Sequence, residues 1–500
     1  MGSRTASDRF PYASVIPLWF LAGILRVPRL FLRWGEANWD YASYHETLAV
    51  ALNSSSPNTW FTSIFVGLQP PLHGLILAGL HPLTSRPALW MLLSIGASWL
   101  AVCIISFAGW HLAGRSGAQL STLFLAVSPP GVIYAGELLN YPLLSLCVAG
   151  MLWGLTVPNR HRWGLLAGIL AGWTHLLGLA SVMGAIVFGA QPMALRLRRA
   201  AVVLVGISPL WLGLSALYHS SHVGRQPGLP WLDRIVLLFS RFGIPGILTL
   251  GVILGAAWGL RKGRWRTIRP VLGALLSTSD LLALSLFGGS AAPHQFQYLV
   301  AFGPIMALVI AVGLPSSSRR HTLGWVVLTL VGGLLLVQTG GGLLHLRTAR
   351  QTPSGLQYAL DQSKPGDAVV LILPHRPDDD KTLISPKFWA LSPWEPMPAA
   401  HDAPGDLPDH RRGQPRKWRD RTIYVYSKVF PAPLHDIFDA HRARGHSTWL
   451  VHQNIDEDSR RSLPMRQALN RTGAQMVLPP TALMGDRTWH IPPTAPRSIR

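Results

Sequence analysis

Long apolar runs separated by short basic breaks constrain the fold of this chain more than any other feature. Several runs reach the roughly 17–25 residues that a helix needs to span a bilayer. Only 13% of the residues are charged, well below the roughly 25% usual in soluble domains. The sequence therefore predicts an α-helical polytopic membrane protein. The apolar runs cover residues 88–110, 117–134, 143–157, 200–217, 244–260, 271–288, 298–314 and 323–339.

The net charge of +21 is concentrated in the short breaks between the apolar runs. Short loops rich in Lys and Arg stay on the cytoplasmic side of a membrane and contact anionic lipids. We therefore interpret these breaks as topology signals and predict membrane-lipid partners and no nucleic acid. The breaks are "PNRHRW" (158–163), "RLRR" (196–199), "RKGRWRTIR" (261–269) and "SSRRH" (317–321).

One apolar segment, 67–83, is predicted not to cross the membrane. If the N-terminus is inside and this segment does not span, every basic break falls inside. The segment contains "QPPLHG" and "HPL", and proline removes helix donors that lipid cannot replace. We expect an interfacial or re-entrant helix within a first outer loop, 33–87. The stretch 12–25 is interpreted as a retained helix rather than a signal peptide.

The resulting prediction is about eleven spans of roughly 20 residues. The stretch 163–193 is too long for one helix and is divided at "WTH". Arg26 and Arg29 end the first span on the outer side, against the positive-inside bias. Either the topology is inverted or these arginines meet an anionic group in the outer leaflet. The spans are 12–32, 88–110, 117–134, 142–157, 163–177, 179–193, 200–218, 237–260, 271–288, 298–314 and 323–343.

Beyond residue 345 the pattern changes from apolar spans to alternating strands and helices. Turn residues bound three predicted strands, and helical apolar spacing follows two of them. The sequence predicts a transmembrane domain, 1–345, and a small α/β domain, 346–500, which an odd number of spans places outside. The stretch 376–420 is expected to be irregular. The strands are 365–374, 421–427 and 446–453, and the helices are 433–445 and 459–474.

Candidate reactive groups gather in the predicted outer loops. A carboxylate can take a proton from a nucleophile, and cationic or amide donors can hold a phosphate, so the set suits group transfer from a lipid phosphate. The alternatives stay open: the acids cap helices near headgroups, and His73 satisfies an interface. His175, within the divided stretch, either packs or lines a cavity. The candidates are Arg26, Arg29, Glu36, Asp40, Tyr44, His45, His73, Glu137, Arg234, His294, Gln297 and Tyr298.

Four short motifs in order give a resemblance to a known family. Asp40, Tyr44, His45 and Ala49 form an outer-loop pattern. It is followed by "PPLHGLILAGL" (70–80), by a helix with Gly and Arg within 111–146, and by "QYLVAFGPIMALVIAVGL" (297–314). Over roughly residues 10–345 the chain resembles the GT-C superfamily of polyprenol-dependent glycosyltransferases, on the branch of the protein O-mannosyltransferases and the aminoarabinose lipid A transferase.

The resemblance implies an inverting glycosyltransferase that uses a polyprenyl-phosphate sugar at the periplasmic face of a bacterial inner membrane. Asp40 matches the family's first-loop acid, which is the catalytic base or the residue that orients the acceptor, and Glu137 is the nearest second-loop acid. The family's acid near Asn140 and its basic residue near Gln297 are absent here. A divalent cation is an open alternative, although no clear metal-ligand set is present.

Two other functions were weighed against the glycosyltransferase. The missing acid and basic residue favour a catalytically weakened homologue acting as a membrane scaffold or partner-binding protein. A transporter is disfavoured, because transporters usually show internal repeats and charges near the bilayer midplane. In this sequence the charges lie at loop edges and no internal repeat is found.

Overall fold

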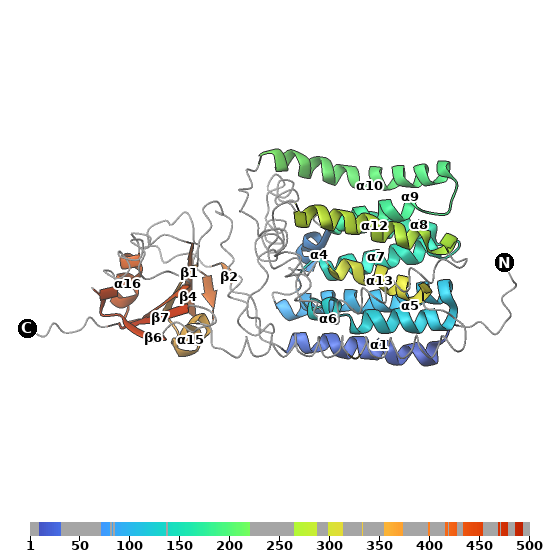
Figure 1. Ribbon diagram of the computed structural model, residues 1–500. Helices are drawn as coiled ribbons and strands as arrows, with labels where there is room; N and C mark the ends of the chain where they lie inside the picture. The colour runs from blue at the N-terminus through green and yellow to red at the C-terminus, as the bar shows by residue number, and fades with distance from the viewer. Residues whose placement is uncertain are drawn as a thin grey trace, which may run out of the picture. The chain divides into compact units, whose positions relative to one another are not determined.

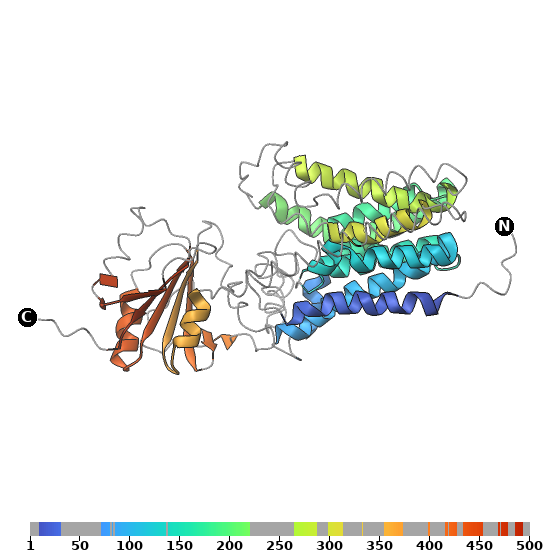
Figure 2. The same cartoon turned by 60° about the horizontal axis from the view of Figure 1, so that its bottom comes forward.

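A computed structural model describes the chain as two compact units. The first, here called the bundle, comprises Met1–Phe31, Leu48–Pro82 and Leu89–Leu344, and the second, here called the sheet unit, comprises Leu32–Thr47, Leu83–Ala88 and His345–Arg500. Figures 1 and 2 show helices lying side by side in the bundle and a sheet in the other unit. The residues that the structure describes are 10–31, 72–80, 83, 86–136, 139–220, 265–287, 299–313, 333, 355–373, 399–400, 416–418, 420–427, 434–453, 469–470, 472–478 and 486–493.

Helices make up the described part of the bundle, and most of them coincide with predicted spans. Of the predicted spans, 237–260 lies outside the described residues and 323–343 almost wholly so. The basic cluster 196–199 lies inside a helix rather than in a break, as a correction to the sequence analysis. The helices are α1 (Tyr12–Arg26, followed by the 3-10 turn η1, Val27–Leu30), α4 (Leu72–Leu80), α5 (Pro87–Val127), α6 (Pro129–Ile133), α7 (Tyr141–Thr156), α8 (His161–Thr174), α9 (Leu176–Val187), α10 (Met193–Ser220), α12 (Trp265–Phe287) and α13 (Leu299–Gly313).

The 41-residue helix α5 is a helical hairpin rather than one long rod. Its backbone leaves the helical region at Ala113 and Gly114, and Gly114 has φ +69°, a conformation that glycine adopts at little cost. Gly109 and Gly117 would be about 12 Å apart along one helix, yet a Cβ on Gly109 would lie 2.5 Å from the Gly117 carbonyl oxygen. The two arms therefore run antiparallel, as the separate predictions 88–110 and 117–134 required.

Neighbouring helices of the bundle run in alternating directions. Near the start of α1, Phe10 stacks on Phe107 with ring centroids 4.3 Å apart, whereas Arg26 at its end bonds Ser98, so α1 is antiparallel to the first arm of α5. The same opposed order relates α7 to α8 through the close approach of Gly154 to Gly164. This up-and-down order is the one that successive membrane crossings require.

The surface of the bundle is apolar, as expected for a protein surrounded by lipid. On α1, Ile16, Phe20 and Ile24 recur every fourth residue with 38%, 70% and 65% of their surface exposed. A contiguous exposed apolar stripe of this kind is unusual in a soluble monomer. Among the described helices, the segment Ala88–Val127 is long and apolar enough to cross a membrane by length and composition. Close glycine contacts between helices are also typical of membrane bundles.

Helix α4 corresponds to the segment that was predicted not to cross. It has nine residues, a length of about 14 Å against the roughly 30 Å of a hydrocarbon core. It packs on α8 within the bundle, and Figure 1 draws it at the end where α1 finishes rather than begins. The predicted segment 67–83 thus contains a helix, and its position along the membrane stays a prediction.

The sheet unit is built on a seven-stranded sheet of order β2-β3-β4-β1-β5-β7-β6. The central strands β4, β1 and β5 are parallel, and the pairs at both edges are antiparallel. The strands are β1 (Ala368–Leu373), β2 (Ala399–Ala400), β3 (Arg416–Trp418), β4 (Arg421–Ser427), β5 (Thr448–Gln453), β6 (Gln475–Leu478) and β7 (Asp486–Ile491), and the helices are α15 (Gly355–Gln362) and α16 (Leu434–Ala443).

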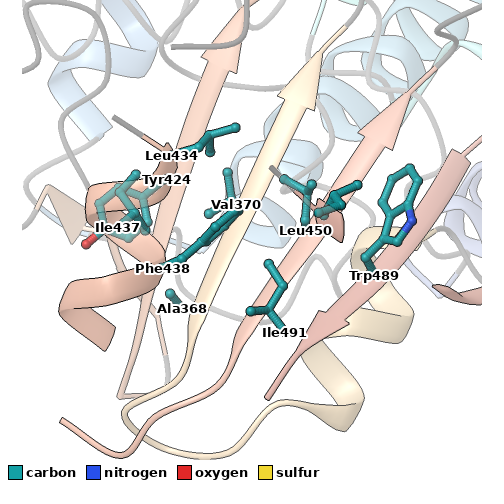
Figure 3. Close-up of a cluster of buried hydrophobic side chains, with 10 residues drawn as sticks. Ala368, Val370, Tyr424, Leu434, Ile437, Phe438, Leu450, Trp489 and Ile491 are labelled. Carbon is teal, nitrogen blue, oxygen red and sulfur yellow. The ribbon is translucent and has the colours of Figure 1, made fainter. Parts of the chain in front are cut away.

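Each face of the sheet carries one buried apolar cluster. On one face Val370 and Leu450 pack with Phe438 of α16 (Figure 3), and on the other Val369 packs with Leu360 of α15. The three predicted strands are β1, β4 and β5. The expectation of an irregular 376–420 is corrected by β2 and β3, whose short antiparallel pairing carries little periodicity in the sequence.

Candidate functional site

The start of α7 is held by a buried amide. Asn140 comes directly before α7 and has no exposed surface, and its Nδ2 donates to the Thr174 carbonyl oxygen at 2.9 Å. Pro142 lies in the first turn of α7, where its missing N–H costs nothing. The bond ties the segment between α5 and α7 to the far end of α8.

A histidine occupies the break between α8 and α9. His175 has φ −166° and ψ 153°, an extended conformation that ends α8 and begins α9. Its Nδ1 accepts from the Leu177 backbone N–H at 3.1 Å. In a neutral ring the proton is then on Nε2. The ring centroid lies 5.4 Å from that of Tyr141.

We call Asn140, Tyr141, Thr174 and His175 the hairpin tip, because they surround the turn between α8 and α9. Their side chains supply an amide, a phenol, a hydroxyl and an imidazole, which together donate and accept hydrogen bonds without a permanent charge. The stretches 139–145 and 170–180 contain no Lys or Arg. Of the four residues, Asn140, Tyr141 and Thr174 have no exposed surface, and His175 is half-buried.

Arg26, predicted to meet a donor phosphate, is occupied by the protein itself. It is 1% exposed, and its guanidinium donates to the Ser98 hydroxyl at 2.9 Å and to the carbonyl oxygens of Ala22, Ala126 and Leu125 at 3.0 Å each. Four of the five N–H donors of the group are therefore used. We assign Arg26 to positioning the end of α5, in place of the phosphate contact.

His73 is the one predicted first-loop residue whose side chain the structure describes. It lies on α4 and is 1% exposed. Because α4 packs on α8, the burial of His73 agrees with the alternative in which it satisfies a helix interface.

The other predicted site residues keep the status of predictions. Arg29 lies in the 3-10 turn after α1, and only its backbone is described. Those outside the described residues are Glu36, Asp40, Tyr44, His45, Glu137, Arg234, His294, Gln297 and Tyr298.

The sequence analysis passed over one residue with a clear signal. Asp280 is an acid within the apolar run 271–288, and ionisable residues in such runs mark functional sites more often than chance. It lies on α12 three residues after Ser277 and seven after Gly273, two residues through which α12 contacts α9. This spacing puts position 280 on the same stripe of the helix.

No metal site emerges from the residues described: among them, no three His, Cys, Asp or Glu lie together in a way that could hold an ion. Cys103 and Cys147 are both buried free thiols.

The sheet unit has a buried histidine of its own. His441 on α16 is 3% exposed, and its Nε2 lies 3.1 Å from the Tyr424 hydroxyl. Burial lowers the pKa of His441 to about 4, because a charged ring loses hydration there. The ring is neutral at pH 7 and joins α16 to β4, which is a structural role.

Comparisons with known proteins show which solved structures share the fold of this chain. No protein-family model matches the sequence, and no curated protein matches it either. Among solved structures, the chain is similar to ArnT from Cupriavidus metallidurans bound to undecaprenyl phosphate, with TM-score 0.59 and 15% identity over 96% of this chain and 98% of that chain. The apo state of ArnT gives TM-score 0.57 at 15% identity over 97% and 98%. The chain therefore has the fold of ArnT over nearly its whole length, in agreement with the family resemblance of its motifs.

Proposed function

We propose that this chain is an inverting glycosyltransferase that moves a sugar from a polyprenyl-phosphate donor to an acceptor at the outer face of a membrane. The observation that carries the proposal is the shared fold over nearly the whole of both chains, since ArnT was solved with undecaprenyl phosphate bound. The order of Asp40, the short helix α4 and the later motifs supports it.

The proposed topology has eleven spans, with the N-terminus inside and the sheet unit on the periplasmic side of a bacterial inner membrane. The alternating directions of the described helices support this order. Cysteine labelling tests it: a cysteine at position 380 should react from outside and one at 262 from inside. The reverse pattern at both positions would mean that the protein is upside down in the membrane.

In the proposed reaction, one displacement at the anomeric carbon moves the sugar. The acceptor hydroxyl or amine attacks that carbon while its proton passes to the Asp40 carboxylate. The bond from the anomeric carbon to the phosphate oxygen breaks, and polyprenyl phosphate leaves with the electron pair. A single displacement inverts the configuration, whereas a nucleophilic carboxylate pair would retain it. Glu137 would orient the acceptor, and Glu36, Tyr44 and His45 would line the site.

Replacing Asp40 gives the test of the proposed base. Asp40→Asn should fold and insert normally but transfer sugar roughly 10²–10⁴-fold more slowly, the usual contribution of a general base. Glu137→Gln should cost less, because an orienting residue does not accept the proton. Transfer is measured with a radiolabelled polyprenyl-phosphate sugar and a membrane extract as acceptor. Full activity in a well-folded Asp40→Asn protein would remove Asp40 from catalysis.

A second candidate is a catalytically weakened homologue that acts as a scaffold or binds a partner. It is favoured by Asn140, whose amide is bonded to Thr174 at the place where the family has an acid. This candidate expects donor binding without transfer, so a wild-type protein that binds undecaprenyl phosphate yet transfers no sugar to any acceptor would select it.

A further inference from the structure

Helices α8 and α10 run parallel, with their starts at the same end of the bundle. His161, the first residue of α8, interacts electrostatically with Arg199 of α10. Further along α8, Ile169 lies where a Cβ on Gly206 of α10 would touch it. Since residue numbers rise together from the first contact to the second, the two helices point the same way. Figure 1 draws both starts at the end of the bundle where α1 begins.

Two arginines lie on the facing stripes of these helices, close to the same level. Arg162 precedes Ile169 by two helical turns and therefore shares its face of α8. Arg199 precedes Gly206 by the same two turns and shares its face of α10. Because Ile169 and Gly206 approach each other closely, positions 162 and 199 are level as well. Arg162 is exposed and Arg199 is half-buried, so both side chains keep surface with which to meet a ligand.

These helices supply no carboxylate to balance the two charges. The stretch 138–232, which contains α7 to α10, has no Asp or Glu. Among the residues that the structure describes, neither Arg162 nor Arg199 forms an ion pair. Like charges at one level repel each other, and α8 has no side-chain cap at its positive N-terminal end. The arrangement therefore favours an anion from outside the chain.

Helix α9 covers one side of the α8–α10 pair and leaves the other side open. On α8, a Cβ on Gly168 would touch a side chain of α9. On α10, Arg196 donates to a backbone carbonyl oxygen of α9. Residues two positions apart on a helix point in nearly opposite directions. Leu166 and Arg198 therefore point away from α9, in agreement with the exposure of both.

On this open side, exposed apolar residues continue from the arginines along the helices. Leu166 lies one turn after Arg162 and is 46% exposed, and Leu170 follows one turn later. Val202 lies one turn after Arg198 and is 47% exposed. Charge followed by an apolar stripe matches the order of phosphate and acyl chain in a phospholipid.

We propose that the open side of the α8–α10 pair binds one anionic phospholipid, with its phosphate between Arg162 and Arg199 and an acyl chain along Leu166 and Val202. Arginine is well suited to a phosphate, because its N–H groups form paired bonds with the oxygens. The basic breaks predict general contacts with anionic headgroups, whereas this inference assigns a defined site to one lipid. It does not rest on the proposed reaction, whose donor belongs at the outer face, while this end faces inside in the proposed topology.

Lipid binding by the intact protein tests the site. The probes are phosphatidylglycerol, phosphatidylethanolamine and undecaprenyl phosphate, and bound lipid is measured by native mass spectrometry. The wild-type protein should prefer phosphatidylglycerol to phosphatidylethanolamine, which has no net charge. Arg162→Gln and Arg199→Gln should each weaken phosphatidylglycerol binding about tenfold, as expected for a hydrogen bond between charged groups. The double variant should lose less than the product of the two, because both residues hold one phosphate.

Arg160→Gln is the matched control. Arg160 is exposed at the same helix start, but it lies two residues before Arg162 and over the ring of Trp153 on α7. Its substitution should leave binding unchanged. Equal weakening by all three single substitutions, or no preference for phosphatidylglycerol in the wild type, would indicate general headgroup attraction and overturn the site.

Two competing ligands would also overturn the proposal. Full displacement of the lipid by inorganic phosphate would assign the arginines to a free anion. If Arg162→Gln weakened the binding of undecaprenyl phosphate and not of phosphatidylglycerol, this end would hold the donor, and the proposed topology would be wrong as well.

A fluorescence measurement covers the case in which an arginine variant does not fold. Leu166→Cys and Phe20→Cys replace exposed apolar residues of α8 and α1, and each carries a fluorescent label. Phosphatidylglycerol with brominated acyl chains should quench the label at 166 more than brominated phosphatidylethanolamine does, whereas at position 20 the two lipids should quench equally. Cys103 and Cys147 are buried and add little background. Equal quenching by the two lipids at both positions would contradict a selective site.

Discussion

The two helical hairpins of the bundle are both closed by near contacts of a glycine with the backbone of the opposite arm, but their arms differ in length. In α5 the arms meet at Gly109 and Gly117, and in α8–α9 a Cβ on Gly178 would meet the Ala171 carbonyl. The first arm of α5 runs about 39 Å before its turn, and charged Arg115 follows the turn. The α8–α9 arms are about half as long and turn at neutral Thr174 and His175.

In both hairpins the absence of a glycine side chain lets the two arms approach closely, whereas the residues at the two turns differ. A turn at the membrane surface meets water and tolerates charge. A turn inside the hydrocarbon layer has to satisfy its backbone and side chains within the protein. At the turn of the short hairpin the polar groups are bonded within the protein: the Thr174 carbonyl oxygen accepts from Asn140, and His175 Nδ1 accepts from the Leu177 N–H.

The largest expected effect comes from removing the residue that anchors the C-terminal end of α5. Arg26→Met leaves the carbonyl oxygens of Leu125 and Ala126 without their buried donor. Each such loss costs about 1–3 kcal/mol, so the variant should unfold at a much lower temperature in detergent. Arg115→Gln is the control, since Arg115 is exposed. An Arg26→Met protein of normal stability that no longer binds undecaprenyl phosphate would instead support the phosphate contact that the sequence predicted for Arg26.

A smaller effect is expected from tightening either hairpin with one methyl group. Gly109→Ala would meet the Gly117 carbonyl and Gly178→Ala the Ala171 carbonyl, and overpacking of this kind costs about 1–3 kcal/mol. Gly96→Ala, on the first arm of α5, meets nothing within 4 Å and should be neutral or slightly stabilising. The unfolding temperatures of the three variants in detergent measure these differences in stability. If Gly178→Ala alone were tolerated, the α8–α9 arms would not pack as described.

The smallest effect expected at neutral pH is on the stability of the sheet unit, which provides a comparison with the bundle. The folded pKa of His441 is about 4 against 6.5 for a free ring, so between these values the unfolded chain binds more protons. Stability of the sheet unit is therefore complete above pH 6.5 and falls as the pH drops toward 4. Burial lowers the pKa of His490 in the same direction.

Hydrogen exchange of β1 and β4 in the full-length protein measures this pH response. In His441→Asn the titrating group is absent, so protection of these strands should fall less between pH 6.5 and 4 than in the wild type. Identical profiles for the two proteins would show that His441 does not control the stability of the sheet unit.

Sequence reasoning was most successful where the signal is local. The break in 163–193 was placed at "WTH", and the structure puts it at His175, because a polar dipeptide in a long apolar run is visible without a partner. The three central strands were found for the same reason. Short edge strands such as β6 carry too few residues for a period to show.

The site was harder to predict, because its bonds join residues far apart in the chain. Arg26 reaches Ala126, one hundred residues away, and Asn140 reaches Thr174. No spacing in the sequence shows that the guanidinium N–H groups of Arg26 already donate to other groups of the protein. Asp280 could have been noticed from the sequence alone, since an acid stands out within an apolar run.

The most direct test of the proposed function is a structure of the protein in nanodiscs with undecaprenyl phosphate bound. The account predicts the phosphate beside Asp40. Phosphate bound only along the exposed apolar stripe of α1, and away from Asp40, would contradict it.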